Sequence, residues 1–142
     1  MVDASLIGRK IAELEGYLAQ IAEYKAISVR EYKKDWKTQR IIERTLHLMI
    51  ELCIDIANHV ISDKGLRVPS SYADAFRVLM ENGIIRKSLF NRLEKMAKFR
   101  NIIVHQYEQV DPEIVVSILK NNLRDFEEYK KAILKTISEK NK

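Results

Sequence analysis

The fold of this chain is decided by residues 41–61, which read IIERTLHLMIELCIDIANHVI. Apolar side chains recur there every three or four residues, which is the spacing of one face of an α-helix. They do so on two faces, which consist of Ile42, Leu46, Met49, Cys53, Ile56 and Val60, and of Ile41, Leu48 and Leu52. A helix with this much apolar surface lies at the centre of a bundle or is shared with another subunit.

Helical spacing continues on both sides of this segment. The predicted helices cover residues 3–27, 35–62, 71–83, 86–104 and 111 to nearly the C-terminus. Residues that favour helix boundaries mark these helices, namely Asp35, Ser71 with Asp74, and Asp111 with Pro112 at starts, and Gly65 and Gly83 at ends. Ser28 with Glu31 resembles a capping box that opens a short helix or a new turn. No stretch has the alternation typical of a strand. We therefore expect one all-α domain over residues 1–142, an up-and-down bundle of about five helices.

Composition narrows the class of protein. Hydrophobic residues make up 46% of the chain and charged residues 32%, which is typical of a globular domain rather than a disordered one. A lone cysteine, Cys53, excludes an internal disulfide and favours a reducing compartment. There is no signal-peptide pattern and no apolar run of about 18 residues, so we expect a cytoplasmic protein outside the membrane.

The net charge of +5 is unevenly spread. Basic residues gather in two places, which are Arg30, Lys33, Lys34, Lys37, Arg40 and Arg44, and Arg86, Lys87, Arg92, Lys95, Lys98 and Arg100. Such clusters are compatible with a polyanion partner and equally with a solvated surface, so charge alone leaves both open.

One cation stands where the helical pattern calls for an apolar residue. Steps of four and three along the fourth predicted helix give Leu89, Leu93, Met96, Arg100, Ile103 and Tyr107. A buried, unpaired guanidinium is costly, so Arg100 needs a carboxylate, a bound anion or a water-filled cleft. Asp55 interrupts an apolar stripe of the long helix and is the expected carboxylate. A structural Arg100–Asp55 pair and a cleft that receives a substrate phosphate are the two interpretations.

The segment around Arg100 reads RNIIVHQY over residues 100–107. On an unbroken helix, Arg100 and His105 would point about 140° apart, so they converge only if the helix ends or distorts near His105 or if the Arg100 side chain reaches around the helix. Asn101 and His105 share a face. No metal-ligand grouping, protein nucleophile or glycine-rich loop accompanies them, which leaves metal-independent chemistry on a phosphate. There His105 could move a proton while Arg100 stabilises negative charge, and RNA would supply its own 2′-hydroxyl nucleophile.

This arrangement, Arg-x4-His-x-Tyr in a small helical bundle, resembles the HEPN superfamily and within it the HepT-like toxins. Further similar stretches are residues 55–59 and 99–105. The resemblance implies a homodimer whose motif helices face each other to form a ribonuclease cleft. It also implies a toxin of a type VII-like toxin–antitoxin system, with Arg100 and His105 as the catalytic pair, Asn101 assisting and no cofactor. A nucleotidyltransferase antitoxin would attach AMP to Tyr107.

Two alternatives remain at this stage. The first is a non-catalytic subunit that binds a nucleotide or substrate for a nucleotidyltransferase, and the second is a scaffold with a structural Arg100–Asp55 pair.

Other side chains are expected to be structural. Asp55, Asn58 and His59 are predicted to make hydrogen bonds in the core, Trp36 to anchor the core, the remaining tyrosines to pack, and His47 to lie at the surface near Glu51.

Overall fold

The computed structural model describes residues 4–140, and within them the chain is helical with no strand. The helices are α1 (Ala4–Ile21), α2 (Val29–Lys34), α3 (Trp36–Asp63), α4 (Tyr72–Glu81), α5 (Lys87–His105), α6 (Pro112–Ser117) and α7 (Leu123–Lys140). Short 3₁₀ turns, η1 (Ala22–Tyr24) and η2 (Tyr107–Gln109), follow α1 and α5, and a π-helical segment, η3 (Ile118–Asn122), joins α6 to α7. Because α6, η3 and α7 continue one another, the predicted all-α bundle of about five main helices is confirmed. The short helix α2 begins at the capping box of Ser28 and Glu31, where a short helix or a new turn was expected.

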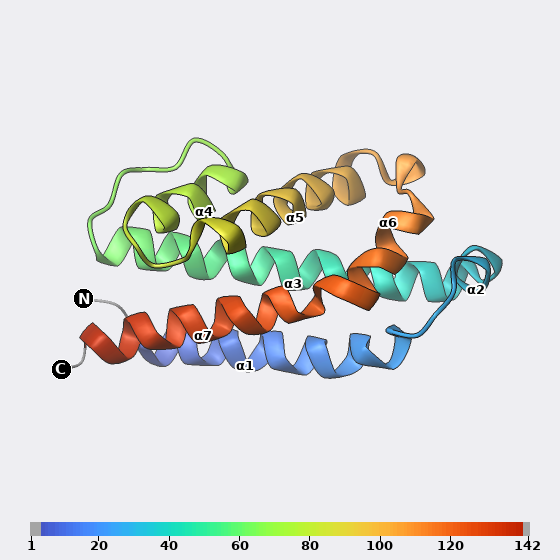
Figure 1. Cartoon of the computed structure of the whole chain (residues 1–142), viewed down its shortest axis with the longest axis horizontal. Helices are drawn as coiled ribbons and strands as arrows, with labels where there is room; N and C mark the ends of the chain where they lie inside the picture. Colours follow the sequence, from blue (N-terminus) through green and yellow to red (C-terminus); the bar gives the residue numbers. More distant parts are fainter. Residues whose placement is uncertain (1–3, 141–142) are drawn as a thin grey trace.

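The long helices lie side by side and alternate in direction (Figure 1). α3 is the central element, since α1, α4 and α5 all pack against it. Its first apolar stripe is buried, as expected, and includes Ile42, Leu46, Met49 and Cys53. Its second stripe stays at the surface of the single chain, where Ile41 is exposed and the others are half-buried. None of the helices within residues 4–140 is both long and apolar enough to cross a lipid bilayer.

Local capping explains most helix boundaries. The predicted capping box is confirmed, because the Glu31 amide donates to Ser28 Oγ and the Ser28 amide donates to Glu31 Oε1. Gly65 and Gly83 have φ angles of +63° and +73°, which side-chain-bearing residues rarely adopt, and each follows a helix end. The first helix is shorter than predicted and ends at Ile21, where its buried stripe also ends.

Several predicted core residues lie elsewhere. Trp36 is 65% exposed and is not a core anchor. It is the first residue of α3 and precedes Ile42, the first buried position of that helix. Asn58 is exposed, and Asp55 and His59 are only partly buried, so these side chains make no core hydrogen bonds. The polar side chains that are buried in the described part of the chain include Glu43 and Asp125.

Cys53 is buried, as predicted. Its burial raises the pKa of the thiol well above the usual range, so the thiolate needed for nucleophilic attack is disfavoured. Cys53 is therefore a small apolar core residue, and its carbonyl oxygen accepts a hydrogen bond of 2.7 Å from the buried Tyr129 hydroxyl.

Candidate active site

An open groove of about 650 Å³ lies between the end of α5 and the loop that precedes α4. Its lining residues are Asn58, Pro69, Ser70, Ser71, Tyr72, Arg100, Asn101 and His105. The groove therefore brings together all three predicted catalytic residues. α5 ends at His105 because Gln106 leaves the helical conformation, with φ −138° and ψ 43°. That helix end meets the condition under which Arg100 and His105 can converge.

The side chain of Arg100 is only 12% exposed and has contacts on three sides. Its Nε and Nη2 both contact Glu51 Oε1 at 2.5 Å, and Nη1 donates to Asn101 Oδ1 at 3.0 Å. The guanidinium carbon lies 4.6 Å from the centre of the Tyr72 ring, in a cation–π contact. Of the expected surroundings of this core-register arginine, which were a carboxylate, a bound anion or a water-filled cleft, the structure shows a carboxylate, Glu51, and an open polar groove.

The expected carboxylate partner was wrong. Asp55 pairs instead with Lys10, at 2.5 Å, and lies 3.8 Å from His59. The contact with Arg100 is made by Glu51, which precedes Asp55 by one turn of α3. The side chain of Glu51 is also one methylene longer than that of Asp55. Sequence alone could not separate these two acids, because the choice depends on the axial offset of α3 against α5.

Glu51 belongs to a line of polar contacts along α3. His47 Nε2 lies 3.2 Å from Glu51 Oε1, and Arg44 Nη1 lies 3.2 Å from His47 Nδ1. Contacts therefore run without a break from Arg44 to Arg100. The spacing of three and four among these residues was the sequence signal for this line of contacts. From it, only the proximity of His47 and Glu51 was predicted.

His105 and Tyr107 differ from Arg100 in being accessible. His105 is exposed, and its imidazole makes no hydrogen bond or ion pair with another residue of the described range, so it is free to meet a ligand in the groove that it lines. Tyr107 lies beyond the end of α5, in η2, and is 59% exposed. It does not line the groove and does not continue the face of Arg100, because the helix stops before it.

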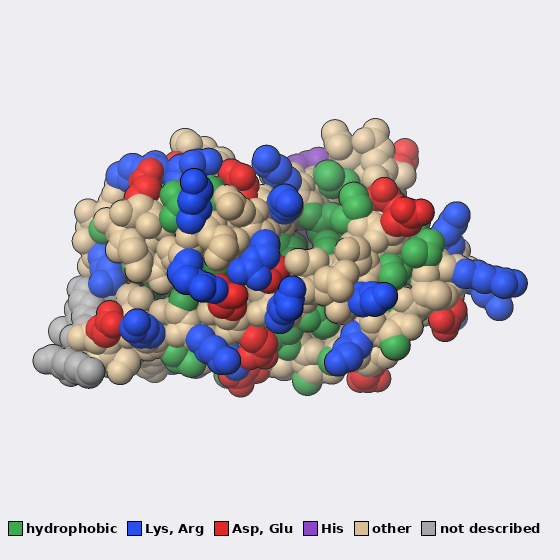
Figure 2. All heavy atoms as spheres, in the orientation of Figure 1, with side chains coloured by type: hydrophobic (Ala, Val, Ile, Leu, Met, Phe, Trp, Pro, Cys, Tyr) green, Lys and Arg blue, Asp and Glu red, His purple; other side chains and the backbone are tan. Residues whose placement is uncertain are grey.

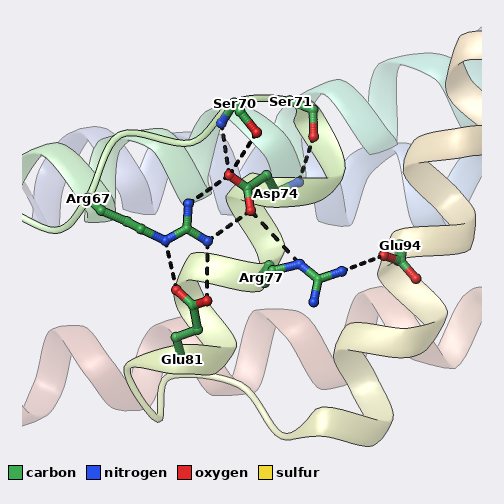
Figure 3. A network of polar contacts seen from close by, with 7 residues as sticks. All are labelled: Arg67, Ser70, Ser71, Asp74, Arg77, Glu81 and Glu94. Atoms are coloured by element: carbon green, nitrogen blue, oxygen red, sulfur yellow. Dashed lines mark hydrogen bonds and ion pairs between the residues drawn. The ribbon is translucent and has the colours of Figure 1, made fainter.

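A polar network holds the loop before α4, which carries the groove residues Ser70 and Ser71 (Figure 3). Arg67 donates to both Asp74 oxygens, at 2.8 and 2.9 Å, and to Glu81. The Asp74 carboxylate also accepts from the Ser70 amide, at 2.8 Å. Hydrogen bonds from Arg67 and Ser70 keep the pKa of Asp74 well below its usual range. The network thus ties the loop carrying Ser70 and Ser71 to the first turn of α4.

Between residues 4 and 140, no three or more His, Cys, Asp or Glu side chains are arranged to hold a metal ion. The polar groups of the groove are a guanidinium, an imidazole, amides and hydroxyls, which suit an anionic, hydrogen-bonding ligand.

Known proteins resemble this chain over most of its length. A family model described as ribonuclease HepT-like matches residues 14–133. An mRNA nuclease HepT of Shewanella oneidensis is 37% identical over 99 residues, which are 70% of this chain and 74% of the relative. A tRNA nuclease HepT of Aphanizomenon flos-aquae is 28% identical over 145 residues, covering 99% of this chain and 97% of the relative.

Solved structures give the same grouping. A tri-AMPylated HEPN toxin of Shewanella oneidensis, in complex with MNT antitoxin, superposes with a TM-score of 0.85. It is 33% identical, and the match covers 95% of this chain and 99% of that one. The similar sequences and the similar structure point to the same family as the motif residues Arg100, Asn101 and His105 in the groove. The chain belongs to the HepT-like ribonuclease family.

Proposed function

We propose that this chain is a metal-independent endoribonuclease toxin that cuts RNA in the groove at the end of α5. The observation that carries the proposal is that Arg100, Asn101 and the exposed His105 line one open groove. The 2′-oxygen of RNA attacks the adjacent phosphorus while the bond to the 5′-oxygen breaks, which leaves a cyclic 2′,3′-phosphate and a 5′-hydroxyl. The protein contributes proton transfer and charge stabilisation.

Each residue has a distinct role in this chemistry. Arg100 balances the negative charge that develops on the phosphoryl oxygens, and its contact with Glu51 keeps its planar group oriented. His105 takes the proton of the 2′-hydroxyl or supplies one to the leaving 5′-oxygen. Asn101 holds the guanidinium from the other side.

A homodimer completes this scheme. The reaction needs both a base and an acid, and a single chain offers one His105. Two copies with facing grooves would provide two imidazoles, and the surface-lying apolar stripe of Ile41, Leu48 and Leu52 offers a face for such pairing. Sedimentation equilibrium at micromolar concentration tests the dimer.

Control by a nucleotidyltransferase antitoxin is part of the proposal. The Tyr107 hydroxyl would attack the α-phosphorus of ATP, forming a phosphodiester with AMP and releasing pyrophosphate. Support comes from the exposure of Tyr107 and from the AMPylated state of the Shewanella oneidensis toxin. A bulky anion beside the groove would oppose entry of RNA. Intact mass after co-expression with an MNT-type enzyme, with and without Tyr107→Phe, tests this step.

Cleavage itself is tested with purified protein and mixed cellular RNA in excess EDTA. We expect cleavage by the unmodified chain and its loss in His105→Ala and Arg100→Ala variants that keep their helical circular dichroism. Cleavage in EDTA that persists in both variants contradicts the site. RNA or nucleotide binding without any turnover favours the alternative, a non-catalytic binding subunit for a nucleotidyltransferase.

A further inference from the structure

The first basic cluster forms a largely unpaired surface on α2 and the first half of α3. Its six cations, which are Arg30, Lys33, Lys34, Lys37, Arg40 and Arg44, are all exposed. Lys and Arg side chains project at this end of the molecule in Figure 2. Only three carboxylates lie in the same stretch of residues 30–44, so the local charge is positive.

Those carboxylates are engaged in local structure. Glu31 accepts from the Ser28 amide, and Asp35 accepts from the Lys37 amide and the Thr38 hydroxyl. Glu43 is 8% exposed and accepts from the Tyr32 hydroxyl at 2.9 Å, with Arg40 more distant at 3.4 Å. The cationic groups are left facing solvent, where they can meet phosphates.

The cations of this cluster differ in their ion pairs from the arginines between residues 67 and 92. Lys33 and Lys34 have no carboxylate partner within the described residues, nor do Arg30 and Lys37. The arginines of that segment are paired instead, since Arg67 pairs with Asp74 and Glu81, Arg77 with Glu94, and Arg92 with Asp125 and Glu128. The lysines of α5, which are Lys87, Lys95 and Lys98, are exposed and form no ion pair with the described residues.

An aromatic ring lies in the middle of this cationic surface. Trp36 is the only tryptophan of the chain, is 65% exposed, and has Lys37 Nζ 5.9 Å from its ring centre. An exposed indole surrounded by cations is the combination that binds single-stranded nucleic acid, because bases stack on the ring while phosphates meet the charges. Duplexes hide their base faces and cannot stack on it in this way.

The surface leads to the groove. Trp36, Arg40, Arg44, His47 and Glu51 follow one another at intervals of four and three, so they share one face of α3. Polar contacts continue this face from Arg44 through His47 and Glu51 to Arg100. Trp36 and Glu51 are separated by about 22 Å along the helix axis, the length of about six stacked nucleotides.

We infer that Trp36, Lys37, Arg40 and Arg44 form a track that binds single-stranded RNA and leads it to the groove. The inference rests on the proposed ribonuclease function and adds a binding surface outside the groove. One base stacks on Trp36, and phosphates on either side pair with the cations of the track. RNA whose cut site has an unpaired segment of about six nucleotides on one side is the preferred substrate.

Binding is measured with the His105→Ala protein and a fluorescein-labelled single-stranded RNA of twelve nucleotides. Trp36 is the sole tryptophan, so its fluorescence reports directly on stacking, and we expect it to be quenched on binding. In anisotropy titrations Trp36→Ala should weaken binding about tenfold, while Trp36→Phe should retain most of the affinity.

Salt dependence separates stacking from charge. Lys37→Ala and Arg40→Ala should each lower the slope of log affinity against log salt by about 0.7, whereas Trp36→Ala should leave the slope unchanged. Lys135→Ala is the matched control, because Lys135 is an exposed cation on α7, away from the first half of α3. It should change neither affinity nor slope.

The outcomes separate this inference from the proposed function. Equal binding and equal cleavage by wild type and Trp36→Ala overturn the track but leave the ribonuclease standing. Trp36-dependent RNA binding without cleavage by the unmodified wild type supports the track and refutes the ribonuclease. Quenching by vesicles of phosphatidylserine and phosphatidylcholine but not by RNA makes the surface a membrane contact and overturns the track.

Discussion

Arg92 and Arg100 lie two turns apart on α5, and their surroundings show what separates a structural arginine from one that can act on a ligand. Each nitrogen of Arg92 has its own acceptor, since Nε donates to the Ser88 carbonyl, Nη1 to Asp125 and Nη2 to Glu128. Arg100 shares a single carboxylate oxygen of Glu51 between Nε and Nη2, donates from Nη1 to Asn101 Oδ1, and has an aromatic ring on its face.

Burial does not make the difference, because Arg100 is less exposed than Arg92, at 12% against 29% of the side chain. What differs is the open side. Arg92 borders a hollow whose lining includes apolar residues such as Phe99 and the acids Asp111 and Glu113, which do not favour an anion. Arg100 borders a polar groove that is also lined by His105. A guanidinium becomes a candidate for catalysis when the space beside it suits an anion.

The largest expected effect is on stability and concerns Arg92, the structural arginine of this comparison. Arg92→Ala leaves Asp125, which is fully buried, with only the Asn122 amide as a partner. An uncompensated buried carboxylate is strongly destabilising, so we expect the free energy of unfolding to fall by about 3 kcal/mol. Urea unfolding followed by circular dichroism measures it. A loss below about 0.5 kcal/mol contradicts the assignment of Arg92 as structural.

Arg100→Ala should give the opposite pattern. Cleavage of RNA should fall by about 100-fold or more, because a group that stabilises transition-state charge is lost. Stability should fall by about 1 kcal/mol at most, since Glu51 is 35% exposed and can be solvated. Single-turnover cleavage and urea unfolding on the same preparation measure both quantities. A large stability loss with unchanged cleavage favours the scaffold interpretation instead.

Replacing Glu51 and Asp55 separately tests whether Glu51 has a specific role in orienting Arg100. Glu51→Gln keeps the size of the side chain but removes the charge that orients Arg100, so kcat/KM should fall about tenfold. Asp55→Asn is the control on the same helix, because Asp55 pairs with Lys10 rather than Arg100, and its effect should be smaller. Equal losses in the two variants would show that Glu51 has no special place beside Arg100.

The smallest expected effect concerns acid stability around Arg92. Burial alone would raise the pKa of Glu128, but hydrogen bonds from Arg86 and Arg92 outweigh it and lower the pKa. A carboxyl whose folded pKa is lowered stabilises the fold above its unfolded pKa of about 4.3, and this stabilisation is lost as the pH falls through the folded value. Glu128→Gln should therefore flatten the fall of the melting temperature below about pH 4. Identical acid limbs in both proteins contradict this.

Local sequence patterns predicted the helices well. Capping at Ser28, Asp35, Ser71 and Asp111 depends on residues two or three positions away, so the signals lie within one turn. The residues of the groove on α5 were also predicted, since Arg100, Asn101 and His105 belong to one short motif. Tyr72, Ser70 and Ser71 were missed as groove residues, because they reach it from a segment about 30 positions earlier.

The sequence by itself determined the all-α class, the central place of α3 and the presence of a polar site around Arg100, because apolar spacing and a misplaced charge are local facts. Only the tertiary structure decided that Glu51 rather than Asp55 meets Arg100, that Tyr72 covers its face, and that Trp36 is exposed beside unpaired cations. Those outcomes depend on how far one helix slides along another and where a helix begins relative to the core, which residue spacing does not encode.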